Sequence, residues 1–139
     1  MNQEMMGKGI HLMLDLYRAD DDKLKDEKLI QKLLDGLPAK IGMEKMCEPK
    51  VIKMEPKGWD QGGVSGFVMI STSHIAMHSF AGYGYLTADV YSCEEFDTEK
   101  VTRLFAEAFN AKIIEKQVIS RGRNFAEEVL PKIKQTIKR

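Results

Sequence analysis

The sequence predicts an α+β fold, a two-layer α/β sandwich in which an antiparallel sheet carries helices packed on one face. Several runs alternate apolar and polar residues with the period of a strand, and others repeat apolar residues with the period of a helix. No internal repeat, linker or low-complexity segment divides the 139 residues. We therefore expect a single domain over residues 1–139.

The N-terminal half begins with a strand and continues into a helix. Residues 9–18 alternate so that Leu12, Leu14 and Leu16 share one side, which we expect to face the core. Residues 23–37 place leucines and an isoleucine near helical spacing, and Pro38 follows at the end of this predicted helix. A short strand is expected over residues 51–54, before a glycine-containing loop that holds Trp59.

Two strand-like runs follow, over residues 64–80 and 83–93, with the turn-prone Ala81-Gly82 between them. We expect these runs to be neighbouring antiparallel strands. In the second run Leu86, Ala88 and Val90 form one apolar side, whereas the opposite side is mixed in polarity. Chemistry could be placed on the mixed side.

The C-terminal part predicts a helix, a strand and a last helix. Asp97 or Thr98 can cap a helix whose apolar residues recur at positions 101, 104, 105, 108 and 109. Residues 111–120 indicate a strand, which Arg121-Gly122 ends. Residues 125–137 predict a final helix that Pro131 can kink.

Composition argues against several classes of partner. Lysine plus arginine equals aspartate plus glutamate, 21 against 21, so no net field favours nucleic acid or an anionic membrane. No run is long enough to span a bilayer, and the first residues lack a basic stretch followed by an apolar one. The expected location is the cytoplasm. Cys47 and Cys93 lack CxxC spacing, so neither a disulfide framework nor a zinc site is indicated.

Residues 63–93 concentrate the side chains that can carry chemistry. Ser73, His78 five residues later and Cys93 on the adjacent strand offer a nucleophile, a proton-transfer group and a second acid. A GxSxG nucleophile elbow is excluded, because the GVSGF sequence around Ser65 lacks the second glycine at the required spacing. His74 and His78 supply two metal ligands at most, so no metal site is expected.

The order GVSG, SHIxxH and YGYxxxDVxxC resembles the core of the prokaryotic S-adenosylmethionine decarboxylases. The likeness extends to Gly9, His11 and Asp15-Leu16-Tyr17 in the first strand and to Arg121-Gly122, so it covers most of the chain. The resemblance implies a proenzyme that cuts itself between Thr72 and Ser73, giving residues 1–72 and 73–139. The implied activity is decarboxylation of S-adenosylmethionine, which supplies the aminopropyl donor for spermidine and other polyamines.

The resemblance also implies a role for each candidate residue. Ser73 would become a pyruvoyl group, which forms a Schiff base with the substrate amine and accepts the electrons released with carbon dioxide. Ser65 and His78 would act in processing, with His78 as the base, and Cys93 would donate a proton during turnover. The pyruvoyl group derives from the chain itself, so no added cofactor and no metal would be required.

Two aromatic residues are expected to bind the nucleoside part of the substrate. Trp59 and Phe80 resemble the family positions whose rings sandwich the adenine, and such stacking contributes roughly 1–3 kcal/mol. In the family these rings come from different subunits. The resemblance therefore implies a homodimer with shared sites.

The chain departs from the family pattern in two places, and each departure keeps an alternative open. Phe80-Ala81-Gly82 replaces a Trp-Pro-Glu sequence, and Gly82 offers no side chain to the ribose hydroxyls. This favours a pyruvoyl-dependent decarboxylase of arginine or ornithine as the second hypothesis. Thr72 stands where the family usually has glutamate, which favours as the third a non-cleaving, non-catalytic homologue that binds a nucleoside or regulates a related subunit.

Overall fold

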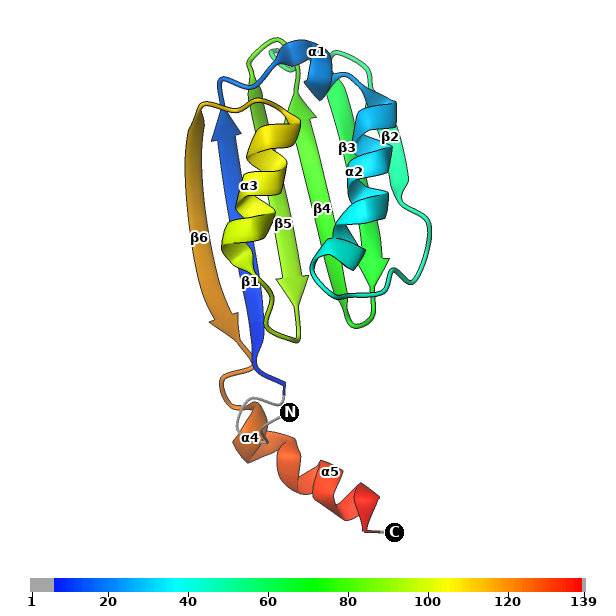
Figure 1. The fold of residues 1–139 in the computed structure, drawn as a ribbon, viewed down its shortest axis with the longest axis vertical. Coiled ribbons are helices and arrows are strands. Elements are labelled where there is room, and N and C mark those ends of the chain that lie inside the picture. Colours follow the sequence, from blue (N-terminus) through cyan, green and yellow to red (C-terminus); the bar gives the residue numbers. More distant parts are fainter. Residues whose placement is uncertain (1–6, 139) are drawn as a thin grey trace.

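The largest element of the computed structural model, which describes residues 7–138, is a six-stranded sheet (Figure 1). Its strands are β1 (Gly9–Tyr17), β2 (Lys50–Met54), β3 (Gly63–Ile70), β4 (Ser73–Phe80), β5 (Tyr85–Ser92) and β6 (Ile113–Arg121). They lie in the order β2-β3-β4-β5-β1-β6, and every neighbouring pair is antiparallel. Of the opening stretch considered above, residues 1–6 lie outside the described part of the chain.

Helices cover one face of this sheet (Figure 1). The helices of the described chain are α1 (Asp21–Leu24), α2 (Glu27–Lys40), α3 (Thr98–Ala108), α4 (Phe125–Glu128) and α5 (Leu130–Ile137). The helices α2 and α3 lie against the sheet and run along its strands, whereas α4 and α5 lie beyond its end (Figure 1). The side chains of Asp26 and Asp97 cap α2 and α3 by accepting hydrogen bonds from Leu29 N (3.1 Å) and Lys100 N (3.0 Å). The predicted antiparallel sandwich with helices on one face is confirmed.

The core lies between the sheet and these two helices. The leucine side of β1 faces it as predicted, since Leu12, Leu14 and Leu16 are buried. The helices contribute apolar residues that are likewise fully buried, including Leu34 of α2 and Phe105 of α3. Alternation along each strand then leaves the opposite side chains on a face without helices, called here the open face.

The prediction of one continuous strand-like run over residues 64–80 is wrong. The run forms two strands, β3 and β4, which pair as a hairpin around a two-residue turn at Ser71-Thr72. The turn was missed because serine and threonine give no glycine, proline or asparagine signal. The pairing of β4 with β5 confirms the predicted antiparallel neighbours.

Two helix boundaries also differ from the prediction. A second helix begins at Glu27 after α1, with Asp26 as its N-cap, and Pro38 lies inside the last turn of α2 instead of after its end. The predicted C-terminal helix is divided at Val129 into α4 and α5, two residues before Pro131. Proline removes a backbone donor, which explains why regular hydrogen bonding stops near it.

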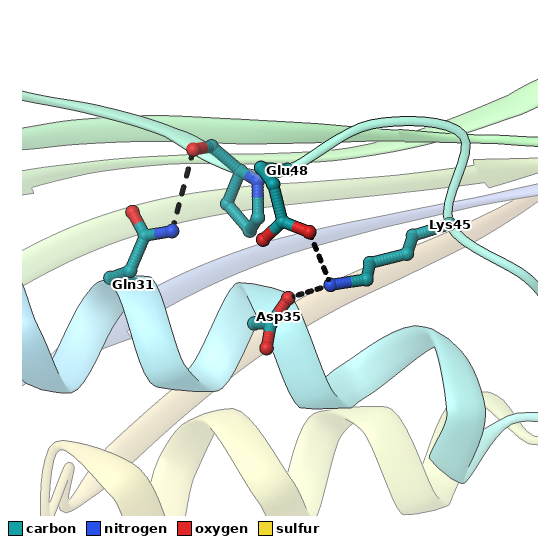
Figure 2. A network of polar contacts seen from close by, with 5 residues as sticks. Gln31, Asp35, Lys45 and Glu48 are labelled. Atoms are coloured by element: carbon teal, nitrogen blue, oxygen red, sulfur yellow. Dashed lines mark hydrogen bonds and ion pairs between the residues drawn. The ribbon is translucent and has the colours of Figure 1, made fainter.

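Side-chain hydrogen bonds attach the segment of residues 44–49, between α2 and β2, to helix α2 (Figure 2). Lys45 Nζ bonds to the carboxylate of Asp35 on the helix and to that of Glu48 at 3.0 Å. Gln31 Nε2 donates to the carbonyl of Pro49 at 3.4 Å. The hydrogen bond to Asp35, followed by that to Glu48, raises the pKa of Lys45 above its usual value. Lys45 therefore stays charged as the centre of this contact.

The same segment reaches the turn between β3 and β4. Lys45 forms an isolated β-bridge with Ile70, and Met46 N donates to Met69 O at 2.7 Å. Ser71 N donates to Glu44 O at 3.4 Å. The contacts of Figure 2 thus connect helix α2 to the Ser71-Thr72 turn through one short stretch of backbone.

Replacing Ser79 with alanine is expected to lower the free energy of unfolding by about 1–3 kcal/mol. The fully buried Ser79 Oγ donates to Leu24 O at 2.7 Å and accepts from Val64 N at 2.8 Å, so its removal leaves buried backbone groups without these partners. The measurement is the urea midpoint of Ser79→Ala against that of Ser120→Ala, an exposed strand serine. Equal midpoints for the two variants would contradict this account.

Candidate active site

A cavity of about 460 Å³ lies on the open face, along β3 and β4. Its polar lining includes Ser65, Ser73 and His78, three of the predicted site residues. Apolar side chains at its edge remain unusually exposed, with Ile52 at 53%, Phe67 at 45% and Met69 at 53%. All three residues therefore line one largely apolar cavity, although the Ser73 side chain is itself nearly buried.

One group of site residues lies at the turn that joins β3 to β4, and we call Thr72, Ser73 and Cys93 the turn group. Ser73, the first residue of β4, is 7% exposed, and its Oγ accepts a hydrogen bond from Cys93 N at 3.2 Å. The Cys93 thiol contacts the hydroxyl of Thr72, with 2.6 Å between Sγ and Oγ1. The predicted scissile position and the predicted proton donor are therefore neighbours.

A second group lies farther along the hairpin, and we call Ser65 and His78 the hairpin pair. These residues are directly opposite each other in the β3–β4 register, and Ser65 Oγ lies 2.7 Å from His78 Nδ1. Ser65 Oγ also donates to Met54 Sδ at 3.1 Å. The His78 tautomer decides the direction of this bond: with its proton on Nδ1, His78 donates to Ser65 Oγ and leaves Nε2 able to accept a proton.

The two groups line the same cavity, but they lie at separate places along the hairpin within one chain. Ser73 and His78 are five residues apart on the same extended strand, a separation of roughly 16 Å at 3.3 Å per residue. The odd spacing also puts the Ser73 side chain on the helix-covered side with Ile75, whereas His78 points to the open face. A single chain therefore presents two incomplete halves of the predicted site.

The predicted aromatic pair lies beside the hairpin pair. Phe80 follows His78 by two residues on the same face, and its ring stacks on Trp59 with centroids 5.9 Å apart and planes at 15°. The Tyr85 ring also stacks on the Phe80 ring, with centroids 5.1 Å apart. Trp59 and Phe80 come together within one chain, so their pairing does not require different subunits.

Two polar pairs on the open face were not singled out from the sequence. Tyr85 Oη donates to Asp15 Oδ1 at 2.7 Å, and His11 Nε2 lies 3.0 Å from Asp89 Oδ1. All four side chains lie on the non-leucine sides of β1 and β5, which are neighbours in the sheet. The alternating pattern predicts which side chains share a face, but only the strand register shows which of them lie opposite each other.

Two tyrosines on this face resist ionisation. A hydrogen bond to Glu115, followed by partial desolvation, raises the pKa of Tyr17 to about 12. Desolvation first and the hydrogen bond to Asp15 second raise the pKa of Tyr85 further. In both cases the phenol is favoured because it donates to a carboxylate that would repel a phenolate.

The stability of the fold is therefore expected to fall as pH rises above about 10, the pKa of an unfolded tyrosine. In that range unfolded tyrosines lose their protons while Tyr17 and Tyr85 keep theirs, so unfolding becomes more favourable with pH. Urea midpoints measured below and above about pH 10 are expected to show a smaller fall for Tyr85→Phe than for the unsubstituted chain. An identical fall in both proteins would contradict this linkage.

The surroundings of Gly82 show what replaces the acidic side chain of the family pattern. Gly82 has a φ of 91°, and its N–H donates to Asp21 Oδ1 at 2.9 Å. A Cβ built at this position would run into the side chain of Gln61. The amide of Gln61 therefore occupies the space beside Gly82, close in sequence to Trp59.

Neither a metal cluster nor a membrane helix is found in the described part of the chain. Among residues 7–138, no three His, Cys, Asp or Glu side chains are grouped so that they could hold a metal ion. Within the same residues, no helix is both long and apolar enough to cross a membrane.

The site differs from that of a GxSxG hydrolase and has the parts of a self-processing proenzyme. A nearly buried serine follows a tight turn, a thiol lies beside it, and a serine–histidine pair lies on the same hairpin. Residues 10–122 match the family model described as S-adenosylmethionine decarboxylase. The chain belongs to this family.

Relatives and a solved structure agree with that assignment. The S-adenosylmethionine decarboxylase proenzyme of Bacillus velezensis is 37% identical over 119 residues, which cover 86% of this chain and 88% of the relative. That of Anoxybacillus flavithermus is 37% identical over 114 residues, covering 82% and 87%. The crystal structure of the adenosylmethionine decarboxylase from Aquifex aeolicus is similar with a TM-score of 0.67 and 29% identity, covering 80% of this chain and 88% of that one. These findings confirm the predicted family, fold and enzyme class.

Proposed function

We propose that this chain decarboxylates S-adenosylmethionine after cutting itself between Thr72 and Ser73. The observation that carries the proposal is the turn group, in which a nearly buried Ser73 follows the candidate scissile bond and contacts Cys93. The names of the relatives, which describe proenzymes of this decarboxylase, support the same reading. They favour S-adenosylmethionine over arginine or ornithine, and an active over a non-catalytic chain.

Self-cleavage can be written with residues of the chain and one water molecule. Ser73 Oγ attacks the carbonyl carbon of Thr72, a C–O bond forms, the C–N bond breaks, and the hydroxyl proton passes to the Ser73 nitrogen. A base then takes the Ser73 Cα proton, and the Cβ–O bond breaks to release Thr72 as a carboxylate. Water replaces the nitrogen, which leaves as ammonia. The resulting pyruvoyl group supplies an electron sink for decarboxylation.

The orientation of Ser73 in the sheet determines from which face a base can reach its Cα proton. The Ser73 Cβ points to the helix-covered side of the sheet, so the hydrogen on its tetrahedral Cα leans toward the open face. His78 lies on the open face and, with Ser65 on Nδ1, can accept a proton on Nε2. Cys93, next to Ser73, is placed to donate a proton to the substrate carbon after carbon dioxide leaves.

Because His78 lies roughly 16 Å along the strand from Ser73, we propose that a second copy of the chain completes each site. A two-fold axis across the open faces, near the middle of β4 at Ala76, would bring Ser73 of each copy toward His78 of the other. The exposed Ile52, Phe67 and Met69 on this face give such a contact an apolar surface. The proposed enzyme is thus a homodimer with two shared sites.

The proposed substrate contacts lie beside the hairpin pair. The exposed Trp59 ring, stacked on Phe80, offers a flat surface for adenine. Gln61 can offer an amide to the ribose hydroxyls where Gly82 has no side chain. A reducing compartment such as the cytoplasm is proposed because neither Cys47 nor Cys93 is in a disulfide.

The test combines the mass of the chain with its activity. Purified protein is expected to give fragments 1–72 and 73–139, the second with a ketone at its N-terminus. The cleaved protein is then supplied separately with carboxyl-labelled S-adenosylmethionine, arginine and ornithine, and labelled carbon dioxide is collected. Release from S-adenosylmethionine alone supports the proposal, whereas release from arginine or ornithine alone would replace the substrate. A chain that stays whole and releases nothing would favour the non-catalytic alternative.

A further inference from the structure

The residue before the candidate cleavage point has an unusual backbone conformation. Thr72 has a φ of 57°, in the left-handed region that L-residues rarely adopt. Within residues 7–138, the other non-glycine residues with positive φ are Arg18 and Asn110, so Thr72 is the β-branched member of this set. A branched Cβ makes the left-handed conformation especially costly.

The type of turn makes threonine a still less favourable residue at position 72. Two-residue hairpin turns usually have positive φ at the first or at both central residues, because those turns match the twist of the strands. Here the first, Ser71, has no positive φ, and the second, Thr72, does. That combination of signs is typical of a type II turn, whose second central residue is usually glycine or asparagine. The chain thus carries threonine where glycine would be relaxed.

Several contacts hold Thr72 in this conformation. The pairing of Ile70 with Ser73 closes the turn, and Ser71 N is bound by Glu44 O from the segment that Lys45 fastens to α2 (Figure 2). Thr72 Oγ1 donates to Ser71 O at 2.6 Å. Since the hydroxyl has one proton, the contact with Cys93 then uses the thiol proton. Strained residues persist where their surroundings fix them in this way.

We propose that Thr72 is a positioning residue for self-cleavage, because its left-handed conformation strains the peptide bond before Ser73 and breaking that bond releases the strain. This inference rests on the proposed function, since it needs cleavage between residues 72 and 73. After cleavage Thr72 is a chain end with a carboxylate, and the hairpin no longer imposes its φ. The departure from the usual glutamate therefore favours processing in this chain.

The test compares Thr72→Gly, Thr72→Ala and Thr72→Val with the unsubstituted protein. Each is made by cell-free synthesis, and the uncleaved chain and fragment 73–139 are followed over time by mass spectrometry. Glycine relieves the left-handed strain, so Thr72→Gly is expected to cleave on the order of tenfold more slowly. Valine keeps the branched Cβ, and the pairing of Ile70 with Ser73 and the bond from Ser71 N to Glu44 O still close the turn without the hydroxyl. Thr72→Val is therefore expected to cleave at close to the unsubstituted rate. The cleavage rate is therefore predicted to rise from the Gly variant to the Ala variant to the Val variant. If side-chain bulk near the Thr72 carbonyl hindered the attack, the rate would instead fall in that order.

A second measurement separates strain from misfolding. Thr72→Gly and Thr72→Val are each combined with Ser73→Ala, and the urea midpoints of the uncleaved chains are compared. The slower Thr72→Gly chain is expected to be at least as stable as the Thr72→Val chain. The inference would be overturned if Thr72→Gly cleaved as fast as the unsubstituted protein, or if it cleaved more slowly but was also less stable. Either result would leave the proposed function in place. An unsubstituted chain that never cleaves would overturn both the inference and the proposed function.

Discussion

Replacing Ser73 with alanine is expected to leave the chain whole and to abolish decarboxylation, the largest effect of any single substitution considered. Alanine has no oxygen to attack the Thr72 carbonyl, and without that step neither the ester nor the ketone can form. The fold should survive, because the hydroxyl makes one hydrogen bond, from Cys93 N, whose loss costs about 1 kcal/mol. Intact-mass measurement and the labelled carbon dioxide assay check both outcomes.

The turn supplies a matched control for this variant. Ser71 is also a serine within the hairpin connection, but its exposed side chain lies two residues before Ser73 and has no part in the proposed reaction. Ser71→Ala is expected to cleave and to turn over substrate like the unsubstituted chain. Fragments ending at residue 72 from Ser73→Ala would show that another group cuts the chain, and the pyruvoyl assignment would then be wrong.

The fold was predictable from sequence to the extent that periodicity determined it. The alternation in β1 and β5 and the helical spacing in α3 reflect burial of one side of each element, and burial is what the pattern records. The turn at Ser71-Thr72 was not predictable, because its conformation is imposed by long-range contacts with Glu44 and Cys93. Local sequence preference there points away from the observed structure.

The candidate site shows a similar division. The residue types and their order gave Ser73, His78 and Cys93, but the distances between them depend on the strands that hold them. Cys93 reaches Thr72 because β5 pairs with β4 in the register that places His74 beside Tyr91. His78 cannot reach Ser73, because five residues of an extended strand separate them. That separation follows from the rise per residue of a strand once residues 73–80 are assigned as one.

Replacing His78 with alanine is expected to slow self-cleavage by at least about 100-fold, the usual contribution of a positioned acid or base. His78 is the proposed acceptor of the Ser73 Cα proton, and Ser65 orients its ring through the 2.7 Å contact at Nδ1. His74, an exposed histidine on the same face and strand, is the matched control, and His74→Ala is expected to cleave normally. The measurement is the rate at which fragment 73–139 appears. Equal slowing by both substitutions would remove His78 from its proposed role.

The shared site makes a stronger prediction when two defective chains are combined. The S73A chain cannot be cut but retains His78, whereas the H78A chain retains Ser73 but lacks its base. Alone, the S73A chain is expected to stay whole, and the H78A chain is expected to be cut only at its slowed rate. In mixed dimers, one site combines Ser73 of the H78A chain with His78 of the S73A chain, so the H78A chain should be cleaved and the S73A chain should not.

Mass spectrometry can distinguish these outcomes, because the two substitutions give chains and fragments of different mass. Co-expression of the two variants, with mixed dimers verified by native mass spectrometry, is expected to yield fragment 73–139 from the H78A chain alone. If each site were built within one chain, no mixed dimer would be cut, since neither chain holds both residues. Cleavage in the mixture thus follows only if the roughly 16 Å between Ser73 and His78 along β4 is bridged by the second copy. Intact chains in verified mixed dimers would contradict the shared site while leaving the Ser73 assignment in place.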